Sequence, residues 1–319
     1  MFILCPADLF QSSISQLPIM SSELPPPAEN QAYITVSAME AGMIYTDTGL
    51  FIDTVAVNTT FEWVPALTFL LKHSTKNTNF LFDLGIWKDH PKSPPKLLSS
   101  LPSSFKVEIP QDAIEALAKG GLTPLDIDTV CISHVHFDHT GYSVPFTKSE
   151  FILGGDAAML FEESGFWPEE PDSPFRSGLV PLERTKFLGD NVKWEPIGPF
   201  PRAHDFYGDG SLYIIDAPGH LPGHINVLAR TSADGGWIYL AGDAAHHWNL
   251  ITGEAGIACN HQTGKAYFHQ NPELSRETIR RMREVLKNPR VRVVLAHDLP
   301  WYKENKGGDA FFPGSIKSL

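Results

Sequence analysis

Residues 134–141 read HVHFDHTG, and they directly follow DTVCIS (128–133), a short apolar run that we predict as a strand. Extended backbone places His134 and His136 on one side of the chain, and a turn then brings Asp138 and His139 close to them. Desolvating three imidazoles and a carboxylate together would be costly without a cation. The stretch therefore predicts a metal site.

Further imidazole and carboxylate groups follow other predicted strands. His220 comes after SLYIID (211–216), Asp243 ends GWIYLAGD (236–243), and His297 lies at the end of VRVVLAHD (291–298). Side chains at the carboxyl ends of strands converge at one rim of a sheet. Imidazole and carboxylate groups suit zinc, iron or manganese, and this set is large enough for two metals that share one carboxylate.

At this point the sequence resembles the metallo-β-lactamase superfamily. HVHFDHTG is similar to its HxHxDH signature, and the remaining motifs follow in family order over roughly residues 33–300. These are Asp83 in FLFDLG, His220 in APGHLPGH, Asp243 in LAGDAAHH and His297 in VLAHD. The resemblance implies an α/β (α+β) fold, a four-layer αββα sandwich with metals at one edge.

The resemblance also implies the ligand sets of two zinc ions, with iron or manganese as alternatives. The first metal would be held by His134, His136 and His220, the second by Asp138, His139 and His297, and Asp243 would bridge them. Asp83 would orient a ligand, and His224 would lie outside the metal ligands. A metal-bridging hydroxide would attack a carbonyl carbon, and Asp138 would pass a proton to the leaving group.

The branches of the superfamily differ in chemistry. Flavodiiron oxidoreductases usually carry Glu at the position of His136 and are disfavoured, and RNA-processing members carry extra domains and basic surfaces. Quorum-quenching lactonases fit better, because residues 64–85 and Phe137 resemble theirs, and fungal lactamases share the pattern. Where lactonases often have a tyrosine that assists at the substrate carbonyl, this chain has His246, which we consider a second catalytic candidate.

We therefore expect a metal-dependent hydrolase that opens a cyclic ester or amide, a lactone or a lactam such as a benzoxazolinone. The alternatives are an N-acyl homoserine lactonase, a glyoxalase II-like thioesterase and an iron-dependent sulfur dioxygenase.

The composition limits the partners. The 319 residues include 25 Lys+Arg and 37 Asp+Glu, a formal net charge of −12, which disfavours nucleic acid. No apolar stretch is long enough to span a membrane, and the N-terminus is a poor secretory signal. The three cysteines are widely scattered, which favours a reducing compartment. We expect a cytoplasmic enzyme with a small-molecule substrate; the oligomeric state stays open.

Along the chain, we predict a flexible tail over residues 1–30, with Met20 as an alternative start, and a single domain over 31–319. ALTFLLKH (66–73) and FLFDLG (80–85) predict a hairpin, and residues 165–210 predict a long loop. Helices are expected over 111–120, 156–164 and from Asn271 to Asn288. Pocket aromatics are expected at Tyr142, Phe166, Trp167, Phe175 and Trp248, whereas no role is assigned to His73, His90, His204, His261 and His269.

Overall fold

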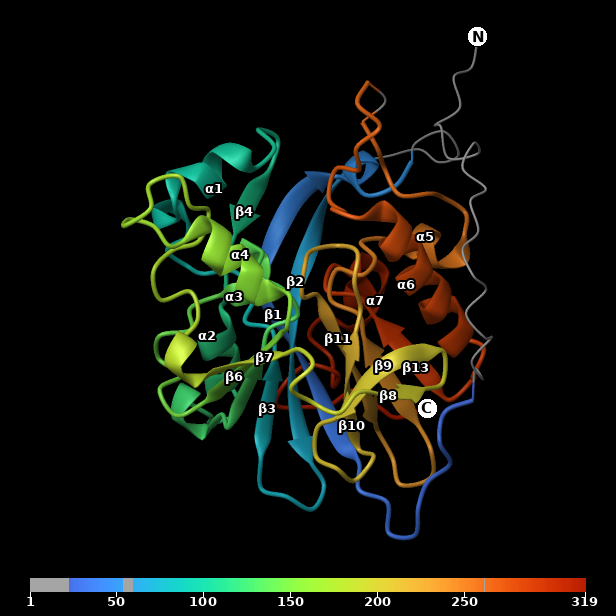
Figure 1. The fold of residues 1–319 in the computed structure, drawn as a ribbon. Coiled ribbons are helices and arrows are strands. Elements are labelled where there is room, and N and C mark those ends of the chain that lie inside the picture. The colour runs from blue at the N-terminus through green and yellow to red at the C-terminus, as the bar shows by residue number, and fades with distance from the viewer. Residues whose placement is uncertain (1–22, 54–59, 261) are drawn as a thin grey trace.

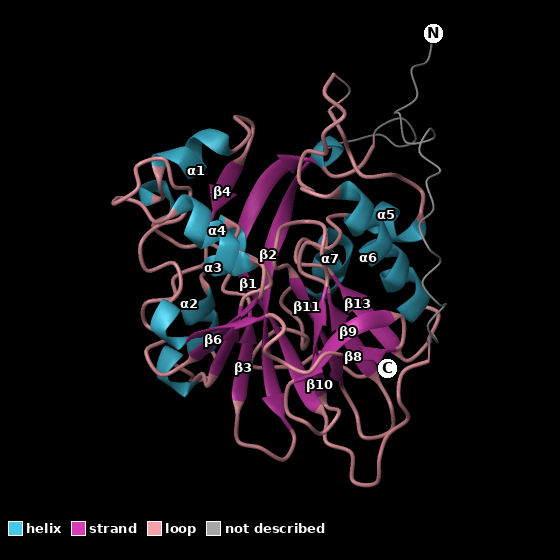
Figure 2. Cartoon of the chain, in the orientation of Figure 1, coloured by secondary structure: helices cyan, strands magenta, loops and turns pink. Residues whose placement is uncertain are grey.

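In the computed structural model, which describes residues 23–53, 60–260 and 262–319, two β-sheets pack face to face. Helices cover the outer face of each sheet, so that the layers run helix, sheet, sheet, helix (Figures 1 and 2). This confirms the expected four-layer sandwich. None of the helices in the described part of the chain has the length and apolarity of a membrane-spanning segment.

The first sheet has the strand order β4-β1-β2-β3-β5-β6-β7. Its strands are β1 (Ile34–Asp47), β2 (Phe61–His73), β3 (Asn79–Phe82), β4 (Lys106–Glu108), β5 (Thr129–Cys131), β6 (Glu150–Gly154) and β7 (Thr185–Leu188). Strands β2 and β3 form the predicted antiparallel hairpin, with Phe69 opposite Phe82. Strands β3, β5, β6 and β7 run parallel, so their carboxyl ends share one edge.

The second sheet has the strand order β13-β12-β11-β10-β9-β8. Its strands are β8 (Glu195–Ile197), β9 (Phe200–Asp205), β10 (Leu212–Asp216), β11 (Ile225–Arg230), β12 (Trp237–Leu240) and β13 (Val291–Val294). Strands β12 and β13 are parallel and β10 pairs antiparallel with β11. The segments that follow β10, β12 and β13 carry the predicted ligands of this sheet.

The helices are α1 (Pro95–Ser100), α2 (Ala113–Ala118), α3 (Phe137–Thr140), α4 (Ala157–Ser164), α5 (Trp248–Thr252), α6 (Pro272–Val285) and α7 (Leu299–Asn305). The three predicted helices correspond to α2, α4 and α6. Helix α2 begins with a capping box between Asp112 and Glu115. In α6, Asn271 is the N-cap and Pro272 occupies the first turn of the helix. These local signals are why α2 and α6 are predictable, whereas α4 begins without a side-chain cap.

The main core lies between the two sheets. Buried side chains of the first sheet, such as Leu71 and Phe82, form one cluster with Ile214, Val227 and Leu240 of the second. Two further clusters fill the spaces between each sheet and its helices. Because strands of both sheets are buried on both faces, the sequence shows continuous apolar runs there instead of alternation.

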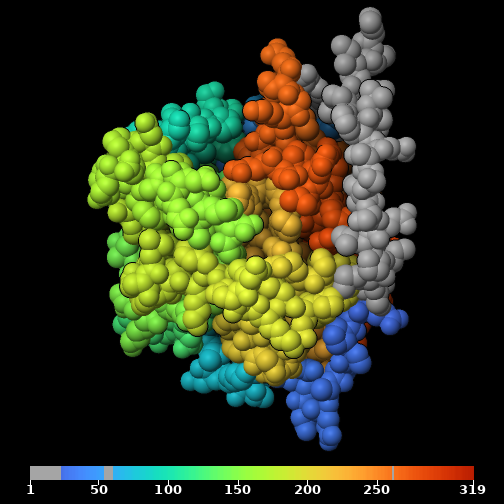
Figure 3. All heavy atoms as spheres, in the orientation of Figure 1, coloured from blue at the N-terminus to red at the C-terminus, as the bar shows by residue number. Residues whose placement is uncertain are grey.

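The long loop predicted over residues 165–210 is only partly correct. This segment contains β7, which extends the first sheet, and β8 and β9, which extend the second. In Figure 3 its yellow-green surface runs across the face of the molecule from one half to the other. Its strands are only three to six residues long; β7 pairs with β6, β9 pairs with β10, and β8 pairs with β9 in an irregular register. No local periodicity therefore marks them.

The predicted flexible tail over residues 1–30 differs from the structure near its C-terminal end. Residues 1–22, including Met20, lie outside the described residues. Leu24 is buried in the apolar cluster of the second sheet, and Arg230 donates a hydrogen bond to the carbonyl of Pro25 at 3.0 Å. These contacts hold residues 24–25 against the second sheet, so they are not part of a flexible tail.

A polar contact joins the two sheets at the edge away from the predicted ligands. His73, at the end of β2, lies with its Nε2 2.9 Å from Oδ2 of Asp209, in the β9–β10 connection. Lys76 and Ser211 also donate to this carboxylate. Burial raises the pKa of Asp209, but these hydrogen bonds outweigh it and lower the pKa to about 2.

Because the pKa of folded Asp209 lies below the value of 3.8 for an unperturbed carboxyl, its ionised form stabilises the fold above that value. We expect Asp209→Asn to lower the free energy of unfolding by about 1–2 kcal/mol at pH 7. The difference from wild type should shrink as the pH falls from 4 toward 2. Urea unfolding at several pH values measures this, with fully exposed Asp190→Asn as the control. A pH-independent difference would contradict the assignment.

Candidate metal centre

The predicted ligands converge at one edge of the sandwich, as expected from their positions after strands. Helix α3 follows β5 and carries Asp138 and His139 on its single turn, with His136 at its N-cap. The turn after β10 carries His220, and the segments after β12 and β13 carry Asp243 and His297. All of them are buried except His136, which is partly exposed. The structure brings together three sets of potential ligand atoms. The first is His134, His136, His220 and Asp243, the second is Asp138, His139, Asp243 and His297, and the third is His220, His246 and His269.

In the first set, three imidazole nitrogens point at one another. Nε2 of His134 is 2.8 Å from Nδ1 of His136, and Nε2 of His220 is 3.1 and 2.9 Å from these two atoms. Oδ2 of Asp243 lies 3.6 Å from His134 and 3.5 Å from His220. The arrangement offers three nitrogens and one carboxylate oxygen to a single ion, the donor types that zinc takes in tetrahedral sites.

In the second set, Nε2 of His139 and Nε2 of His297 both lie 3.3 Å from Oδ1 of Asp243. Nε2 of His297 is also 3.3 Å from Oδ2 of Asp138. Asp243 thus presents one carboxylate oxygen to each set. This is the geometry that a shared, bridging carboxylate would require.

The hydrogen bonds around these rings leave their lone pairs facing the centre. Ser133 donates its hydroxyl proton to Asp83, so its oxygen accepts from Nδ1 of His134 at 3.1 Å. Nδ1 of His297 donates to the backbone carbonyl of Pro65 at 2.8 Å, and a carbonyl can only accept. In the neutral rings, Nε2 of His134 and of His297 therefore carry lone pairs. The lone pair of His134 faces the ring nitrogens of His136 and His220, an arrangement that is repulsive without a cation.

The pKa values of these histidines are shifted because imidazoles and carboxylates are packed closely together. Burial and neighbouring imidazoles hold the pKa of His134 and His220 well below its usual value, so both rings are neutral. Burial also lowers the pKa of His297, but the carboxylates of Asp243 and Asp138 outweigh it and raise the pKa to about 10. The same carboxylates, with Asp83, raise the pKa of His139 well above its usual value. The second set thus attracts positive charge, and divalent cations would satisfy both sets.

Asp83 and His224 lie outside the two sets of candidate ligands and contact them by hydrogen bonds. Asp83 accepts from the backbone N–H of Ser133 at 2.6 Å and lies 2.8 Å from Nδ1 of His139, so that Nε2 of His139 faces the centre. Asp83 adopts a positive φ of 63°, which an aspartate tolerates better than most residues. Nε2 of His224 accepts from the backbone N–H of Asp243 at 3.1 Å and is not free to bind a metal. Burial lowers the pKa of His224 to about 3, which keeps it a neutral acceptor.

His246 lies at the same centre. Its Nε2 is 3.2 Å from Oδ2 of Asp243, and its ring stacks on Phe51 with the centroids 5.1 Å apart. His269, to which the sequence analysis assigns no role, lies beside it with ring centroids 5.1 Å apart, and 5.3 Å from the ring of His220. His269 precedes α6 and follows no predicted strand, so no sequence signal places it here. Its Nδ1 lies 2.9 Å from the hydroxyl oxygen of Ser275.

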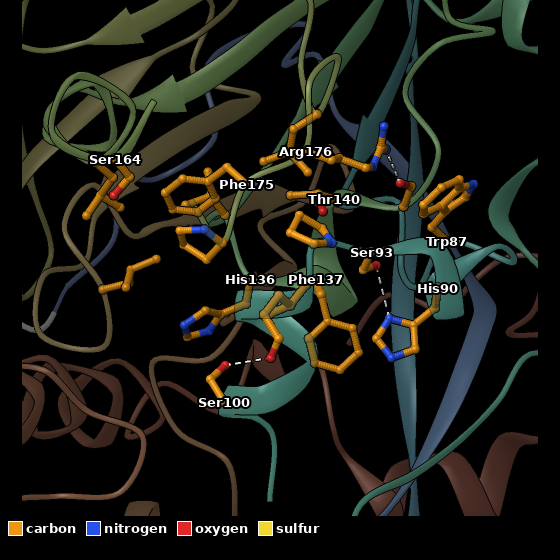
Figure 4. Close-up of a pocket in the computed structure, with 18 of the residues that line it drawn as sticks. Trp87, His90, Ser93, Ser100, His136, Phe137, Thr140, Ser164, Phe175 and Arg176 are labelled. Atoms are coloured by element: carbon orange, nitrogen blue, oxygen red, sulfur yellow. Dashed lines mark hydrogen bonds between the residues drawn. The ribbon is translucent and has the colours of Figure 1, made fainter. Parts of the chain in front are cut away.

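Two cavities open beside the centre. One, of about 260 Å³, is bounded by Asp138, Asp243 and His246 together with apolar side chains, among them Phe51 and Phe268. The other, of about 320 Å³, includes Phe175, Arg176, Trp87 and His90 (Figure 4). Both are lined by His136 and Phe137, so the cavities adjoin across these two residues.

The structure places some of the aromatic residues expected in a pocket at a cavity and others elsewhere. Phe175 lines the larger cavity, whereas Phe166 packs against Phe161 with ring centroids 5.2 Å apart. Trp248 lines a third cavity next to His246 and His297 and donates to Asp298. Tyr142 is exposed and stacks on Trp87. For Trp167, the structure shows a backbone bridge to Arg176 and no cavity among those beside the centre.

Known proteins share sequence motifs and fold with this chain. The family model described as the metallo-beta-lactamase superfamily matches residues 62–297. The chain therefore belongs to the metallo-β-lactamase superfamily. A crystal structure of a mutant of B. thuringiensis AiiA, with N-decanoyl-L-homoserine bound at its active site, aligns with a TM-score of 0.64 at 18% identity, covering 88% of this chain and 98% of that one. At this identity the likeness supports the fold.

Two curated relatives are fungal. Gamma-lactamase MBL2 of Gibberella moniliformis is 36% identical over 175 residues, which cover 52% of this chain and 70% of that protein. Cytochrome P450 monooxygenase mpaDE' of Penicillium brevicompactum is 28% identical over 329 residues, 91% of this chain and 36% of that protein. The chain thus spans about a third of the length of this longer relative. The family and the lactamase relative support assignment of the chain to the hydrolases.

We expect Asp83→Asn to weaken metal binding about 10- to 100-fold, because an amide cannot hold His139 in the required tautomer as a carboxylate does. Asparagine tolerates the positive φ, so the backbone should be retained. Metal content after dialysis against a graded series of chelator concentrations measures the effect. Asp209→Asn is the matched control, since it removes a carboxylate from another buried histidine, His73, at the edge of the sheets away from the centre. Equal metal retention in both variants would contradict the role of Asp83.

Proposed function

We propose that the chain is a hydrolase that binds two divalent metal ions and opens a cyclic ester or amide. The observation that carries the proposal is the pair of buried histidine–aspartate sets that share Asp243 and face a cavity. Zinc is the ion we expect, with iron and manganese as alternatives, because imidazole and carboxylate ligands suit all three.

The residues fit the metals by the chemistry of their donors. His134, His136 and His220 would hold one ion, Asp138, His139 and His297 the other, and Asp243 would contact both. Bound divalent ions supply Lewis acidity toward a carbonyl and lower the pKa of water.

The side chains at the cavity have separate tasks. The Asp138 carboxylate, buried and beside His297, is the group best placed to carry a proton to the leaving ester oxygen or amide nitrogen. His246 lines the same cavity and would donate a hydrogen bond to the substrate carbonyl. Phe51, Phe137 and Phe268 form apolar walls that exclude water and strengthen these polar contacts.

The relatives support the choice of substrate class. The similarity to a fungal γ-lactamase favours a lactam or lactone, including an aromatic cyclic carbamate such as a benzoxazolinone. His246 in place of the tyrosine expected in N-acyl homoserine lactonases argues against that narrower assignment. Hydrolysis of γ-lactams, γ-lactones, homoserine lactones and glutathione thioesters by zinc-loaded protein would separate these classes. Oxygen uptake with a persulfide would instead indicate the dioxygenase alternative. We also propose a cytoplasmic, small-molecule enzyme without nucleic acid or membrane partners.

Asp138→Asn should lower kcat on the best substrate of the panel by about 100-fold or more, because the amide cannot carry the proton. Chelator should abolish wild-type activity, and added zinc should restore it. The control is Asp216→Asn, a half-buried carboxylate at the end of β10 that pairs with Arg202 and belongs to neither ligand set. Wild-type turnover by Asp138→Asn would refute the proposed mechanism.

His246→Phe should lower kcat about 10- to 100-fold while metal content, measured by mass spectrometry, stays unchanged. Phenylalanine preserves the stacking on Phe51 but cannot donate a hydrogen bond. His246→Gln retains an N–H group and should recover part of the loss. His204→Phe, on β9, is the control. Unchanged kinetics in His246→Phe would leave this residue as a cavity wall.

A further inference from the structure

The larger cavity beside the centre has one feature that the proposed hydrolysis does not use. It encloses about 320 Å³, and its wall is mostly apolar, with Leu97, Leu160, Phe175 and Leu221 among its members. Arg176 is its single Lys or Arg side chain, and no Asp or Glu lines it among the described residues. Figure 4 shows the guanidinium at one end of this cavity, near Trp87, with His136 and Phe137 toward the other. The cavity thus runs from the candidate metal centre to a positive charge.

The chain holds this guanidinium in place by several contacts. Its two terminal nitrogens donate to the carbonyl oxygens of Gly178 at 3.2 Å and of Gly141 at 2.9 Å. Its carbon Cζ lies 4.7 Å from the centroid of the Trp87 ring. That ring stacks on Tyr142 in turn, with the centroids 6.1 Å apart. Arg176 is therefore positioned before any ligand arrives, which reduces the entropy lost on binding.

These contacts leave the charge of Arg176 without an anionic partner. Two of the five N–H donors are used, both by neutral carbonyls. Within the described ranges, no carboxylate lies within ion-pair distance of its nitrogens, and desolvation lowers its pKa. Other guanidinium groups of the chain, such as those of Arg202 and Arg290, do pair with aspartates. A partly buried, unpaired guanidinium in an apolar cavity favours an anionic ligand.

We propose that this cavity binds a carboxylate-bearing, otherwise apolar substituent of the substrate, with the carboxylate on Arg176. The inference rests on the proposed function for the other end of the substrate, whose ring would lie at the metal centre beyond His136 and Phe137. The apolar wall contacts the chain between ring and carboxylate. The substrate class is thus a lactone or lactam acid.

A monoanionic carboxylate fits better than a phosphate. One guanidinium compensates one charge, and its planar donors match a carboxylate in a bidentate contact. A dianionic phosphate would retain a net negative charge against apolar walls. Serine and threonine hydroxyls in the lining, at Ser93 and Thr140, add polar contacts without charge.

Binding of a matched pair of probes to the zinc-loaded protein tests the inference without turnover. The probes are 6-(2-oxocyclopentyl)hexanoic acid and its primary amide, in which a ketone replaces the hydrolysable bond. Calorimetry of wild type should give a Kd about tenfold or more lower for the acid, because a hydrogen bond to a charged group is stronger than a neutral one. High salt should reduce this preference. Equal affinity of the two probes for the wild type would overturn the inference by itself.

Arg176→Met should abolish the preference by weakening acid binding, while the Kd of the amide stays within about twofold. Arg176→Lys should retain part of the preference, since it keeps the charge but not the planar donors. The control is Arg202→Met, because that guanidinium also stacks on a tryptophan, Trp194 at 4.9 Å, but pairs with Asp216 outside this cavity. An Arg176→Met protein that still prefers the acid as wild type does would overturn the inference.

The corresponding lactone acid and lactone amide separate this inference from the proposed function. If the wild type hydrolyses both lactones equally and Arg176→Met has no effect, the carboxylate site is refuted and the hydrolase stands. If neither lactone is hydrolysed but the ketone acid binds in an Arg176-dependent way, the hydrolysis proposal fails and the anion site stands. A higher kcat/KM for the lactone acid, lost in Arg176→Met, supports both.

Discussion

The structure depends on one electrostatic constraint, the burial of two carboxylates and five imidazoles at a single edge. The outer nitrogens of His134, His139 and His297 are hydrogen-bonded to Ser133, Asp83 and the carbonyl of Pro65, so their Nε2 atoms face the centre. The neutral rings of His134 and His220 meet lone pair to lone pair, whereas the carboxylates of Asp138 and Asp243 draw positive charge to His139 and His297. Divalent metal ions, which the family implies, would satisfy both sets, and Asp243 offers one carboxylate oxygen to each.

The pairing of strands within the two sheets brings the candidate ligands to the same edge. Parallel pairing of β3 with β5, and of β12 with β13, directs the segments that follow these strands to the same edge. The apolar cluster between the sheets then fixes the distance between the two halves of the site. His134 and His139 come from one sheet, His220 and Asp243 from the other, so neither sheet alone could assemble a complete ligand set.

The two cavities beside the centre indicate how a substrate would be recognised. The smaller one places Asp138 and His246 against apolar walls, where the proposed reaction would occur. The larger one leads away past His136 to Arg176. A substrate that spans both would be recognised at two separate points, by its carbonyl and by its carboxylate. This would let the same fold accept a ring system common to many compounds and select among them by the distant charge.

The sequence by itself determined the candidate ligand residues, the hairpin of β2 and β3, and the helices with clear caps, α2 and α6, because those signals are local in the chain. HVHFDHTG places three histidines and an aspartate within six positions, and no packing role explains such a group. Tertiary structure alone decided the rest. Strands β7, β8 and β9 are short and form by pairing at the edges of the two sheets, and His269 reaches the centre through the packing of α6. Arg176 faces a cavity only because Trp87 and Gly141, far from it in sequence, fix its guanidinium there.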